Sequence, residues 1–270
     1  MTRLSEKTAI VLGAAGRKNM GQIIARRFAT EGANVVVGGR NTDELRTLAE
    51  DINGAYATCD VTNESDVSNL VATAVERFGS LDIAVNATGK SLLKPFVETS
   101  RQDLEEMVEL QFVGPFLFFQ AVVKSMNRNG SIIQISSATA TIMLEDHAAY
   151  MGTKAGTDHV IRCIADAFGD RGIRANSIAP GFTPTPMTAK AVNKGIAEAF
   201  AREYPLGRVG TSEDIAKAAV WLASDECFMT GQVLQVNGGV TLRRNPRTSE
   251  IIEFVKKAKG IPKSLAQDRS

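Results

Sequence analysis

The chain has 270 residues, of which 44% are hydrophobic and 23% are charged, and its formal net charge is +1. This composition is ordinary for a globular protein and excludes an intrinsically disordered chain. The net charge gives no sign of a nucleic acid or a membrane surface as partner, and the length suits one α/β domain.

The start of the chain and its most apolar stretch carry no targeting signal. The first residues lead directly into a strand-like segment, which leaves no room for a signal peptide. The most apolar stretch, residues 112–123, contains Gly114, Pro115 and Gln120 and is too short to span a bilayer. We therefore expect a soluble cytoplasmic protein that does not bind a membrane.

The three cysteines lie far apart in the sequence. Cys59, Cys163 and Cys227 show no metal-ligand spacing, so we expect no metal site. Their isolation fits a reduced interior without disulfides, and we expect all three to be small core residues.

Short β-branched runs alternate with segments of helical periodicity along most of the chain. The runs predict strands in residues 8–13, 33–39, 55–61, 83–89, 131–137, 173–181 and 232–239. The periodic segments predict helices in residues 22–31, 42–52, 64–78, 102–126, 150–168 and 212–224. Such alternation predicts a doubly wound parallel sheet of the Rossmann type, covered on both faces. We expect one catalytic domain, residues 1–240, followed by a C-terminal extension, residues 241–270.

The first predicted strand runs into a glycine-rich turn that opens a helix. Glycines at 13, 16 and 21 would let the backbone approach a pyrophosphate, and the helix N-terminus offers free N–H groups. The spacing is not GxGxxG, but its position after the first strand favours a nucleotide site over a merely tight turn. The predicted cofactor contacts here are Gly13, Arg17, Lys18, Met20 and Gly21.

The end of the second predicted strand indicates which nicotinamide cofactor the chain uses. A carboxylate at this point would bind the ribose of NAD, whereas arginine accommodates the 2′-phosphate of NADP. The sequence has Arg40 there and no carboxylate before Asp43, and Arg17 and Lys18 add positive charge. A solvated surface role for Arg40 is the simpler alternative, but three cations and a missing acid favour NADP(H).

The next two predicted strands end in polar or small residues at the same edge of the sheet. Asp60 and Val61 follow the third strand, where an adenine ring would lie, and Asn86 and Gly89 end the fourth. We predict that all four contact the cofactor.

The chemistry is predicted at the fifth strand and the helix after it. Tyr150 and Lys154 are four residues apart, which places both on one helix face. We expect the ammonium to lower the pKa of the phenol, so that the tyrosine can exchange a proton with an alkoxide or alcohol. Ser137, at the end of the strand, can hydrogen-bond the same oxygen.

Residues 5–240 resemble the short-chain dehydrogenase/reductase family. The motifs that carry the resemblance are the glycine loop, Asp60-Val61, LDIAVNATG (81–89), ISSATA (135–140), YMGTK (150–154), RANSIAPG (174–181) and the run from 206 to 239. The resemblance implies that Ser137 polarises a carbonyl, Tyr150 is the general acid/base, and Lys154 also holds the nicotinamide ribose. It further implies that Pro180 and Gly181 flank the nicotinamide.

One departure from the family pattern concerns the reaction. The glycine loop is two residues longer than usual and resembles the enoyl-acyl-carrier-protein reductase branch. That branch separates its tyrosine and lysine by six residues, whereas three intervene here, which favours reduction of a carbonyl over a C=C bond.

Two further departures concern the support of the site. The usual NNAG is Asn86-Ala87-Thr88-Gly89, and Gln111 stands where the family has an asparagine that kinks a helix and exposes a carbonyl for a proton relay. Gly114 and Pro115 could supply the kink instead.

Substrate specificity is expected from residues 90–96, 138–149 and 182–201, the last opening a helical lid. The candidate residues for an apolar wall of the substrate pocket are Met143, Leu144, Phe182 and Met187. For each of them, packing in the core or at a subunit interface is the alternative.

The C-terminal extension carries eight Lys or Arg residues and three Asp or Glu residues. Thr248 or Ser249 could cap a helix whose charge order suits the helix dipole. The predicted helix has a narrow apolar stripe formed by Ile251, Phe254, Val255 and Ala258. We expect it to dock on this subunit or a neighbour rather than to act as a basic nucleic-acid arm.

The resemblance implies a homodimer or homotetramer that pairs through the fourth and fifth helices, and four phenylalanines between 112 and 119 fit such an interface. The predicted function is NADP(H)-dependent reduction of a ketone or other carbonyl compound, or oxidation of the alcohol, with a 3-oxoacyl thioester, a steroid or another hydrophobic carbonyl as candidate substrates. The alternatives are an enoyl-thioester reductase-like activity and a non-catalytic NADPH-binding regulatory protein.

Overall fold

A seven-stranded parallel sheet forms the centre of the computed structural model, which describes residues 2–185 and 194–259. The strand order is β3-β2-β1-β4-β5-β6-β7, and all neighbouring pairs are parallel. The strands are β1 (Thr8–Leu12), β2 (Asn34–Gly39), β3 (Ala55–Thr58), β4 (Ile83–Asn86), β5 (Ser131–Ile135), β6 (Arg174–Pro180) and β7 (Val233–Val236). The order reverses between β1 and β4, which confirms the predicted doubly wound fold.

Helices cover both faces of the sheet because successive strand residues point to opposite sides. One face packs against α1 (Met20–Thr30), α2 (Thr42–Asp51) and α8 (Ser212–Ala223), and the other against α3 (Glu64–Phe78), α5 (Gly114–Ser125) and α6 (Ala148–Ala167). On β1, Val11 joins the first layer and Ile10 joins the second, and both are fully buried. Burial on both faces explains the continuous apolar strands. Short helical turns lie at Phe96–Glu98, Ala138–Ala140, Gly169–Arg171 and Val240–Leu242.

A π-helical turn joins two helices that the sequence predicts as one. α4 (Arg101–Val108) continues through the turn Glu109–Val113 into α5. Pro115 has no N–H to donate into the preceding turn, so the wider turn lies directly before it. Gly114 is needed there because a β-carbon would lie 2.9 Å from the carbonyl oxygen of Val61.

The continuous helix 101–125 is long and apolar enough to cross a membrane, judged by length and composition alone. Residues 112–123, which alone are too short to span a bilayer, are therefore part of this longer helix. Phe118 and Phe119 are buried against the sheet, as in the core helix of a soluble protein, which passes the same test.

The C-terminal extension contains α9 (Thr248–Ala258), which packs against α7 (Lys194–Glu203) beyond the end of the sheet. The two helices meet closely, since a β-carbon on Gly195 would lie 2.6 Å from the Cα atom of Val255. The expected cap by Thr248 or Ser249 is wrong. The Glu145 carboxylate instead accepts a hydrogen bond of 2.8 Å from the backbone N–H of Thr248.

Candidate active site

The glycine loop is fixed in a conformation that only small residues allow. Gly13 has φ +95°, and a β-carbon there would lie 2.6 Å from the carbonyl carbon of Ala87. A β-carbon on Gly21 would lie 2.5 Å from the carbonyl oxygen of Gly13. Asn19 holds the loop, since its Nδ2 donates to Gly13 O at 2.7 Å and its Oδ1 caps α1 by accepting from the Gln22 N–H.

This loop fits the pyrophosphate of a dinucleotide. The N–H groups of Met20 and Gly21 are in the first turn of α1, where no intrahelical acceptor is available. The positive end of the helix therefore faces the edge of the sheet at which β1 ends. Arg17 and Lys18 are exposed in the same loop. Their contact with a 2′-phosphate stays a prediction.

Arg40 follows β2 directly, and 76% of its side chain is exposed. The nearest acid recorded is Asp60, whose Oδ2 lies 3.9 Å from Arg40 Nη1. Asp60 accepts hydrogen bonds from the Thr62 N–H and hydroxyl, which lower its pKa below the usual range, with a smaller contribution from Arg40. Asp60 is thus fixed at the end of β3 as an anion, while Arg40 keeps a largely free guanidinium.

The end of β4 connects the glycine loop with Lys154. Asn86 is fully buried, donates to Gln134 Oε1 at 2.8 Å, and accepts from the Thr88 hydroxyl at 2.8 Å. Thr88, one of the two residues at which the family motif departs, therefore helps to pin this strand end. Ala87 contacts Gly13, and a β-carbon on Gly89 would lie 3.4 Å from Lys154 Nζ.

Ser137, Tyr150 and Lys154 come together at the carboxyl edge of the sheet. Ser137 follows β5 and caps the turn Ala138–Ala140, with its hydroxyl 2.8 Å from that of Thr139. Tyr150 is in the first turn of α6, and Lys154 is one turn further, with its Nζ 5.8 Å from the centre of the Tyr150 ring. The spacing that the sequence predicts thus places these three groups next to one another.

Lys154 is a buried cation, with 3% of the residue exposed. Its Nζ donates to Ile135 O at 2.9 Å and to Thr88 O at 3.4 Å, which fixes the ammonium between β4 and β5. Burial lowers its pKa to about 8, against the opposing effect of Asp158. The ammonium is therefore retained at neutral pH and lost in mildly alkaline solution.

The expectation of a lowered tyrosine pKa is wrong for the protein without cofactor. Burial raises the pKa of Tyr150 above its usual value, the Ser137 hydroxyl opposes this change, and the negative charge of Asp158 adds to it. Desolvation is the largest effect on the phenol, and the Lys154 ammonium, 5.8 Å from the centre of the ring, does not offset it. The phenol is thus held as a proton donor at neutral pH.

Gln111 lies in the π-helical turn, and only 1% of it is exposed. Its Nε2 donates to Thr153 Oγ1 at 3.0 Å, and its Oε1 accepts from the Lys90 N–H at 3.3 Å. Its backbone carbonyl accepts a hydrogen bond of 2.6 Å from the Thr157 hydroxyl. This is the carbonyl expected to bind the water of a proton relay, and one of its two acceptor positions is therefore occupied. The side chain thus joins α6 to the segment after β4.

Pro180 ends β6, and Gly181 begins the turn expected beside the nicotinamide. Tyr204, after α7, accepts the Phe182 N–H at its hydroxyl. Gly181 has to be glycine because a β-carbon would overlap that hydroxyl. Burial raises the pKa of Tyr204 to about 12, so it remains a neutral anchor for the turn.

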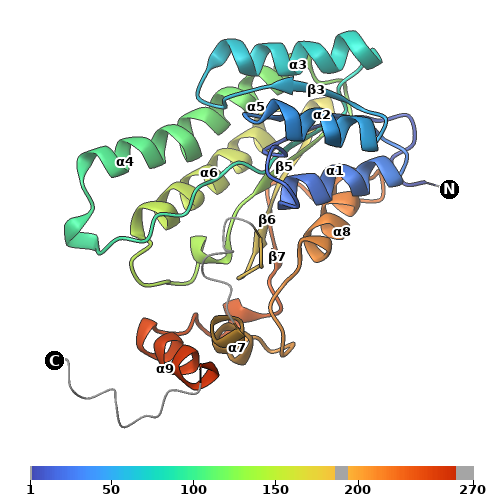
Figure 1. Ribbon diagram of the computed structural model, residues 1–270. Helices are drawn as coiled ribbons and strands as arrows, with labels where there is room; N and C mark the ends of the chain where they lie inside the picture. The colour runs from blue at the N-terminus through green and yellow to red at the C-terminus, as the bar shows by residue number, and fades with distance from the viewer. Residues whose placement is uncertain (1, 186–193, 260–270) are drawn as a thin grey trace.

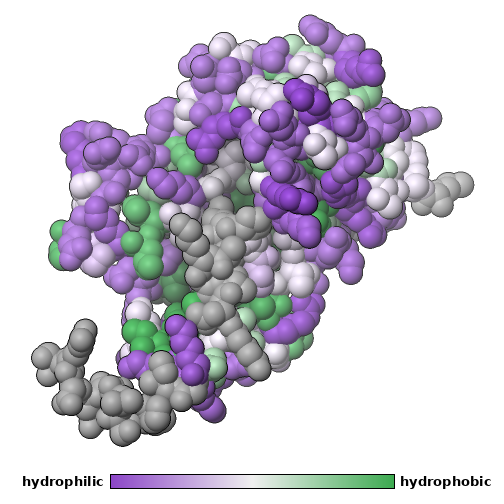
Figure 2. All heavy atoms as spheres, in the orientation of Figure 1, coloured by the Kyte–Doolittle hydropathy of each residue, from purple (hydrophilic) through white to green (hydrophobic). Residues whose placement is uncertain are grey.

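A small apolar cluster lies beyond the carboxyl edge of the sheet, where substrate specificity is expected. It consists of Ala138, Phe200, Tyr204 and Val240. Leu144 and Phe182 pack against it, and Phe182 stacks on Phe200 with ring centres 4.4 Å apart. Met143 is 69% exposed and does not belong to the cluster, while Met187 lies outside the described residues. Hydrophobic residues also gather on the face shown in Figure 2, below α4 and beside α9.

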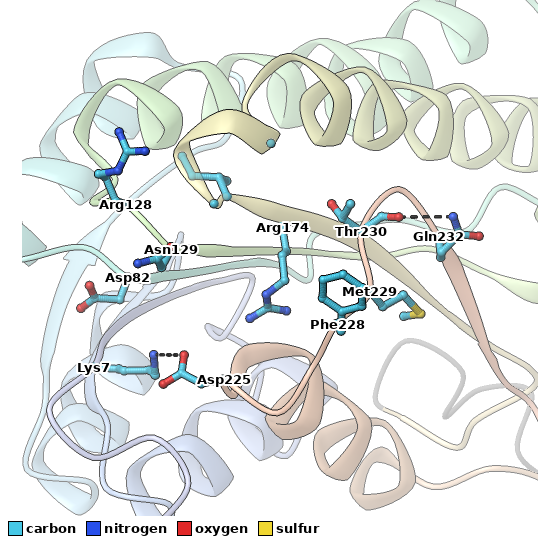
Figure 3. Close-up of a pocket in the computed structure, with 13 residues that line it drawn as sticks. Lys7, Asp82, Arg128, Asn129, Arg174, Asp225, Phe228, Met229, Thr230 and Gln232 are labelled. Atoms are coloured by element: carbon cyan, nitrogen blue, oxygen red, sulfur yellow. Dashed lines mark hydrogen bonds and ion pairs between the residues drawn. The ribbon is translucent and has the colours of Figure 1, made fainter.

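A pocket of about 990 Å³ lies at the opposite edge of the sheet (Figure 3). It is lined by residues that precede the strands, among them Lys7 before β1, Asp82 before β4 and Gln232 before β7. Ligands of doubly wound sheets bind at the carboxyl ends of the strands. This pocket therefore does not belong to the cofactor site.

The cysteines differ in their surroundings. Cys59 and Cys227 are buried as expected, and burial raises the pKa of Cys59 to about 12. Cys163 is exposed on α6, so its expected place in the core is wrong because it lies on the solvent side of that helix. The described residues contain no group of His, Cys, Asp or Glu side chains arranged to hold a metal ion.

Comparison with known proteins identifies the family. The sequence profile described as enoyl-(acyl carrier protein) reductase matches residues 13–241. D-threitol dehydrogenase from Mycolicibacterium smegmatis is 34% identical over 89% of this chain and 95% of its own length. The 3-oxoacyl-[acyl-carrier-protein] reductase from Thermotoga maritima is 33% identical over 89% of this chain and 100% of its own.

A solved short-chain dehydrogenase/reductase from Mycobacterium ulcerans superposes with a TM-score of 0.87 and 30% identity, covering 96% of this chain and 98% of its own. The chain belongs to the short-chain dehydrogenase/reductase family. It is an oxidoreductase of the kind that uses a nicotinamide cofactor on a small molecule.

Three residues of this region escape the sequence analysis. Asp158 is one turn beyond Lys154, Tyr204 anchors the Gly181 turn, and Glu145 caps α9. The i, i+4 spacing from Lys154 was a usable signal for Asp158. The other two act across long sequence separations, for which the sequence offers no local signal.

Proposed function

We propose that the chain is an NADP(H)-dependent oxidoreductase that reduces a ketone to an alcohol, or catalyses the reverse reaction. The observation that carries this proposal is the convergence of Ser137, Tyr150 and Lys154 beside a glycine loop. When bound, the nicotinamide supplies or accepts the hydride at the carbonyl carbon. We also propose a soluble cytoplasmic homodimer or homotetramer, with residues 1–240 as the catalytic domain.

Each of the three side chains has one task in this proposal. The Ser137 hydroxyl donates a hydrogen bond to the carbonyl oxygen and polarises it. The Tyr150 phenol gives its proton to that oxygen as negative charge develops there. The Lys154 ammonium, fixed by Ile135 O and Thr88 O, binds the nicotinamide ribose and stabilises the phenolate that remains.

The choice of NADP(H) depends on the end of β2. Arg40 presents an exposed guanidinium there, and a 2′-phosphate binds such a group through charge-assisted hydrogen bonds. Arg17 and Lys18 in the adjacent loop are also exposed and add positive charge on the same side. The acid that would bind a free ribose hydroxyl is missing directly after β2.

Relatives support an alcohol–ketone pair as the substrate class. They include trans-4-hydroxycyclohexanecarboxylate dehydrogenase from Sinomonas cyclohexanicum, 36% identical over 91% of this chain and 96% of its own. An enoyl-thioester reductase is the second candidate, because the matching profile carries that description. The three-residue interval between Tyr150 and Lys154 favours the ketone.

A substrate panel tests the proposal. Purified protein is mixed with NADPH or NADH and with cyclic ketones, 3-oxoacyl thioesters or enoyl thioesters, and oxidation of the cofactor is followed. We expect ketone-dependent oxidation that is faster with NADPH. Turnover of enoyl thioesters alone would favour the second candidate, and tight NADPH binding without any turnover would favour a regulatory binding protein.

A further inference from the structure

A second buried charge lies beside the catalytic pair. Asp158 follows Lys154 by one turn of α6, and the two residues are 6% and 3% exposed. Side chains four residues apart lie on the same helix face. A buried carboxylate is strongly unfavourable unless a charge and hydrogen bonds compensate it, so its partners indicate its role.

The end of β5 holds both charges through consecutive residues. Ser136 Oγ donates to Asp158 Oδ2 at 2.7 Å, and both groups are buried. The preceding residue, Ile135, accepts the hydrogen bond of Lys154 at its carbonyl. The following residue is Ser137. One short segment therefore sets the position of α6 relative to the serine that would polarise the substrate.

Few other groups face the carboxylate. Burial raises the pKa of Asp158, and the hydroxyls of Ser177 on β6 and of Ser136 oppose this change. Within the described chain, neither Ser177 Oγ nor Asp158 Oδ1 has a hydrogen-bond partner of normal geometry. The cations that act on Asp158 are Lys154 and Arg162, both on α6. Directly after β5, the Ser136 hydroxyl donates to the carboxylate, and on α6 the negative charge of Asp158 raises the pKa of Tyr150. Lys154 is thus the buried cation that the carboxylate can compensate.

We propose that Asp158 is a positioning residue: its carboxylate, held by Ser136, keeps the Lys154 ammonium charged and aligned with Tyr150 and Ser137. Burial favours the neutral amine of Lys154, and the negative charge one turn away opposes this effect. The inference rests on the proposed function, in which Lys154 acts as an ammonium. In this proposal, Asp158 supports the reaction through its negative charge and not through its packing.

Asp158→Asn removes the charge and keeps an oxygen that can accept from Ser136. Asp166→Asn is the matched control, because Asp166 is exposed on the same helix. The pH profile of turnover is measured for both variants and the wild type. In Asp158→Asn, we expect the alkaline decline to move to lower pH by about one unit, since Lys154 loses its proton more easily. A profile identical to that of the wild type and the control would overturn the proposal.

A second measurement does not depend on turnover. Chemical unfolding is followed for the wild type, Asp158→Asn, Lys154→Met and the double variant. We expect Asp158→Asn to lower the unfolding midpoint clearly in the wild-type background and much less with Lys154→Met, because no buried ammonium is then left uncompensated. Equal losses in both backgrounds would overturn the proposal, even for a chain that turns over no carbonyl.

The double variant also decides the case in which Asp158→Asn alone does not fold. If the charge of Lys154 is the cause, Asp158→Asn with Lys154→Met folds, because both buried charges are gone. If the double variant also fails to fold, Asp158 acts through packing and the proposal is wrong.

Discussion

Burial acts in opposite directions on the two titratable groups of the candidate site. It raises the pKa of the Tyr150 phenol and lowers the pKa of the Lys154 ammonium to about 8. Both effects follow from the same cause, because a poorly solvated position favours the neutral form of an acid and of a base. Below pH 8, the site therefore holds a protonated phenol next to a charged amine.

This arrangement predicts the pH dependence of ketone reduction. The ammonium, whose folded pKa lies below the reference value of 10.5, is present below pH 8 and disappears as the pH rises through that value. The rate of reduction at saturating NADPH should therefore be flat near neutrality and fall about tenfold per pH unit well above 8. A rate that stays constant up to pH 10 would contradict the assigned role of Lys154.

Arg40 should decide the preference between the two cofactors. Arg40→Ala should weaken NADPH binding by about 10- to 100-fold, since it removes charge-assisted hydrogen bonds worth about 1.5–3 kcal/mol, and should leave NADH binding almost unchanged. Fluorescence titration with both cofactors measures this. Arg46→Ala on α2 is the control, because its side chain is 52% exposed and it likewise removes a surface guanidinium. Equal weakening of both cofactors would contradict the preference for NADP(H).

At the scale of elements, local sequence patterns predict the helices and strands well. They predict poorly the contacts that these elements make with residues far away in the sequence. The predicted helices of residues 42–52 and 64–78 match α2 and α3 to within one residue, because caps and periodicity are local signals. The predicted cap of α9 is wrong because the N-cap residue is Arg247, and Glu145, about one hundred residues earlier, accepts the N–H of Thr248. The π-helical turn before Pro115 likewise depends on packing against Val61.

The contact between α7 and α9 can be tested at Gly195, where helix propensity and packing have opposite effects on the free energy of unfolding. By helix propensity alone, Gly195→Ala should stabilise the chain by up to about 1 kcal/mol. A β-carbon there would overlap the backbone at Phe254 and Val255, so we predict destabilisation of about 1–3 kcal/mol, measured by urea unfolding. Gly169→Ala is the control, because a β-carbon there meets nothing within 4 Å. Stabilisation by Gly195→Ala would show that α9 does not dock on α7 in solution.

For the whole molecule, the sequence was sufficient to predict the seven strands and the edge at which the site lies. Parallel strands direct their carboxyl ends to one edge, so Gly13, Asn86 and Ser137 had to come together. The burial of Asp158 and the contacts of Gln111 could not be predicted in this way. They depend on how α6 packs against β5, β6 and the π-helical turn.

Cofactor binding should stabilise the entire fold, because the glycine loop, the end of β4 and α6 all contribute to one site. At a concentration 100 times its Kd, NADPH should add about 2.7 kcal/mol to the free energy of unfolding. For a chain of this size, that corresponds to a rise in Tm of roughly 5–10 °C in a thermal shift assay. NADH at the same concentration should give a clearly smaller rise, and an equal one would contradict the assignment of NADP(H).

Tyr150→Phe tests the central claim most directly, because it removes only the hydroxyl that would exchange the proton. NADPH oxidation is measured with the best ketone of the panel, and NADPH affinity is measured on the same preparation. We predict a loss of turnover of at least about 100-fold with cofactor affinity and Tm almost unchanged. Turnover close to the wild-type rate would contradict the account, since the proton would then come from another group.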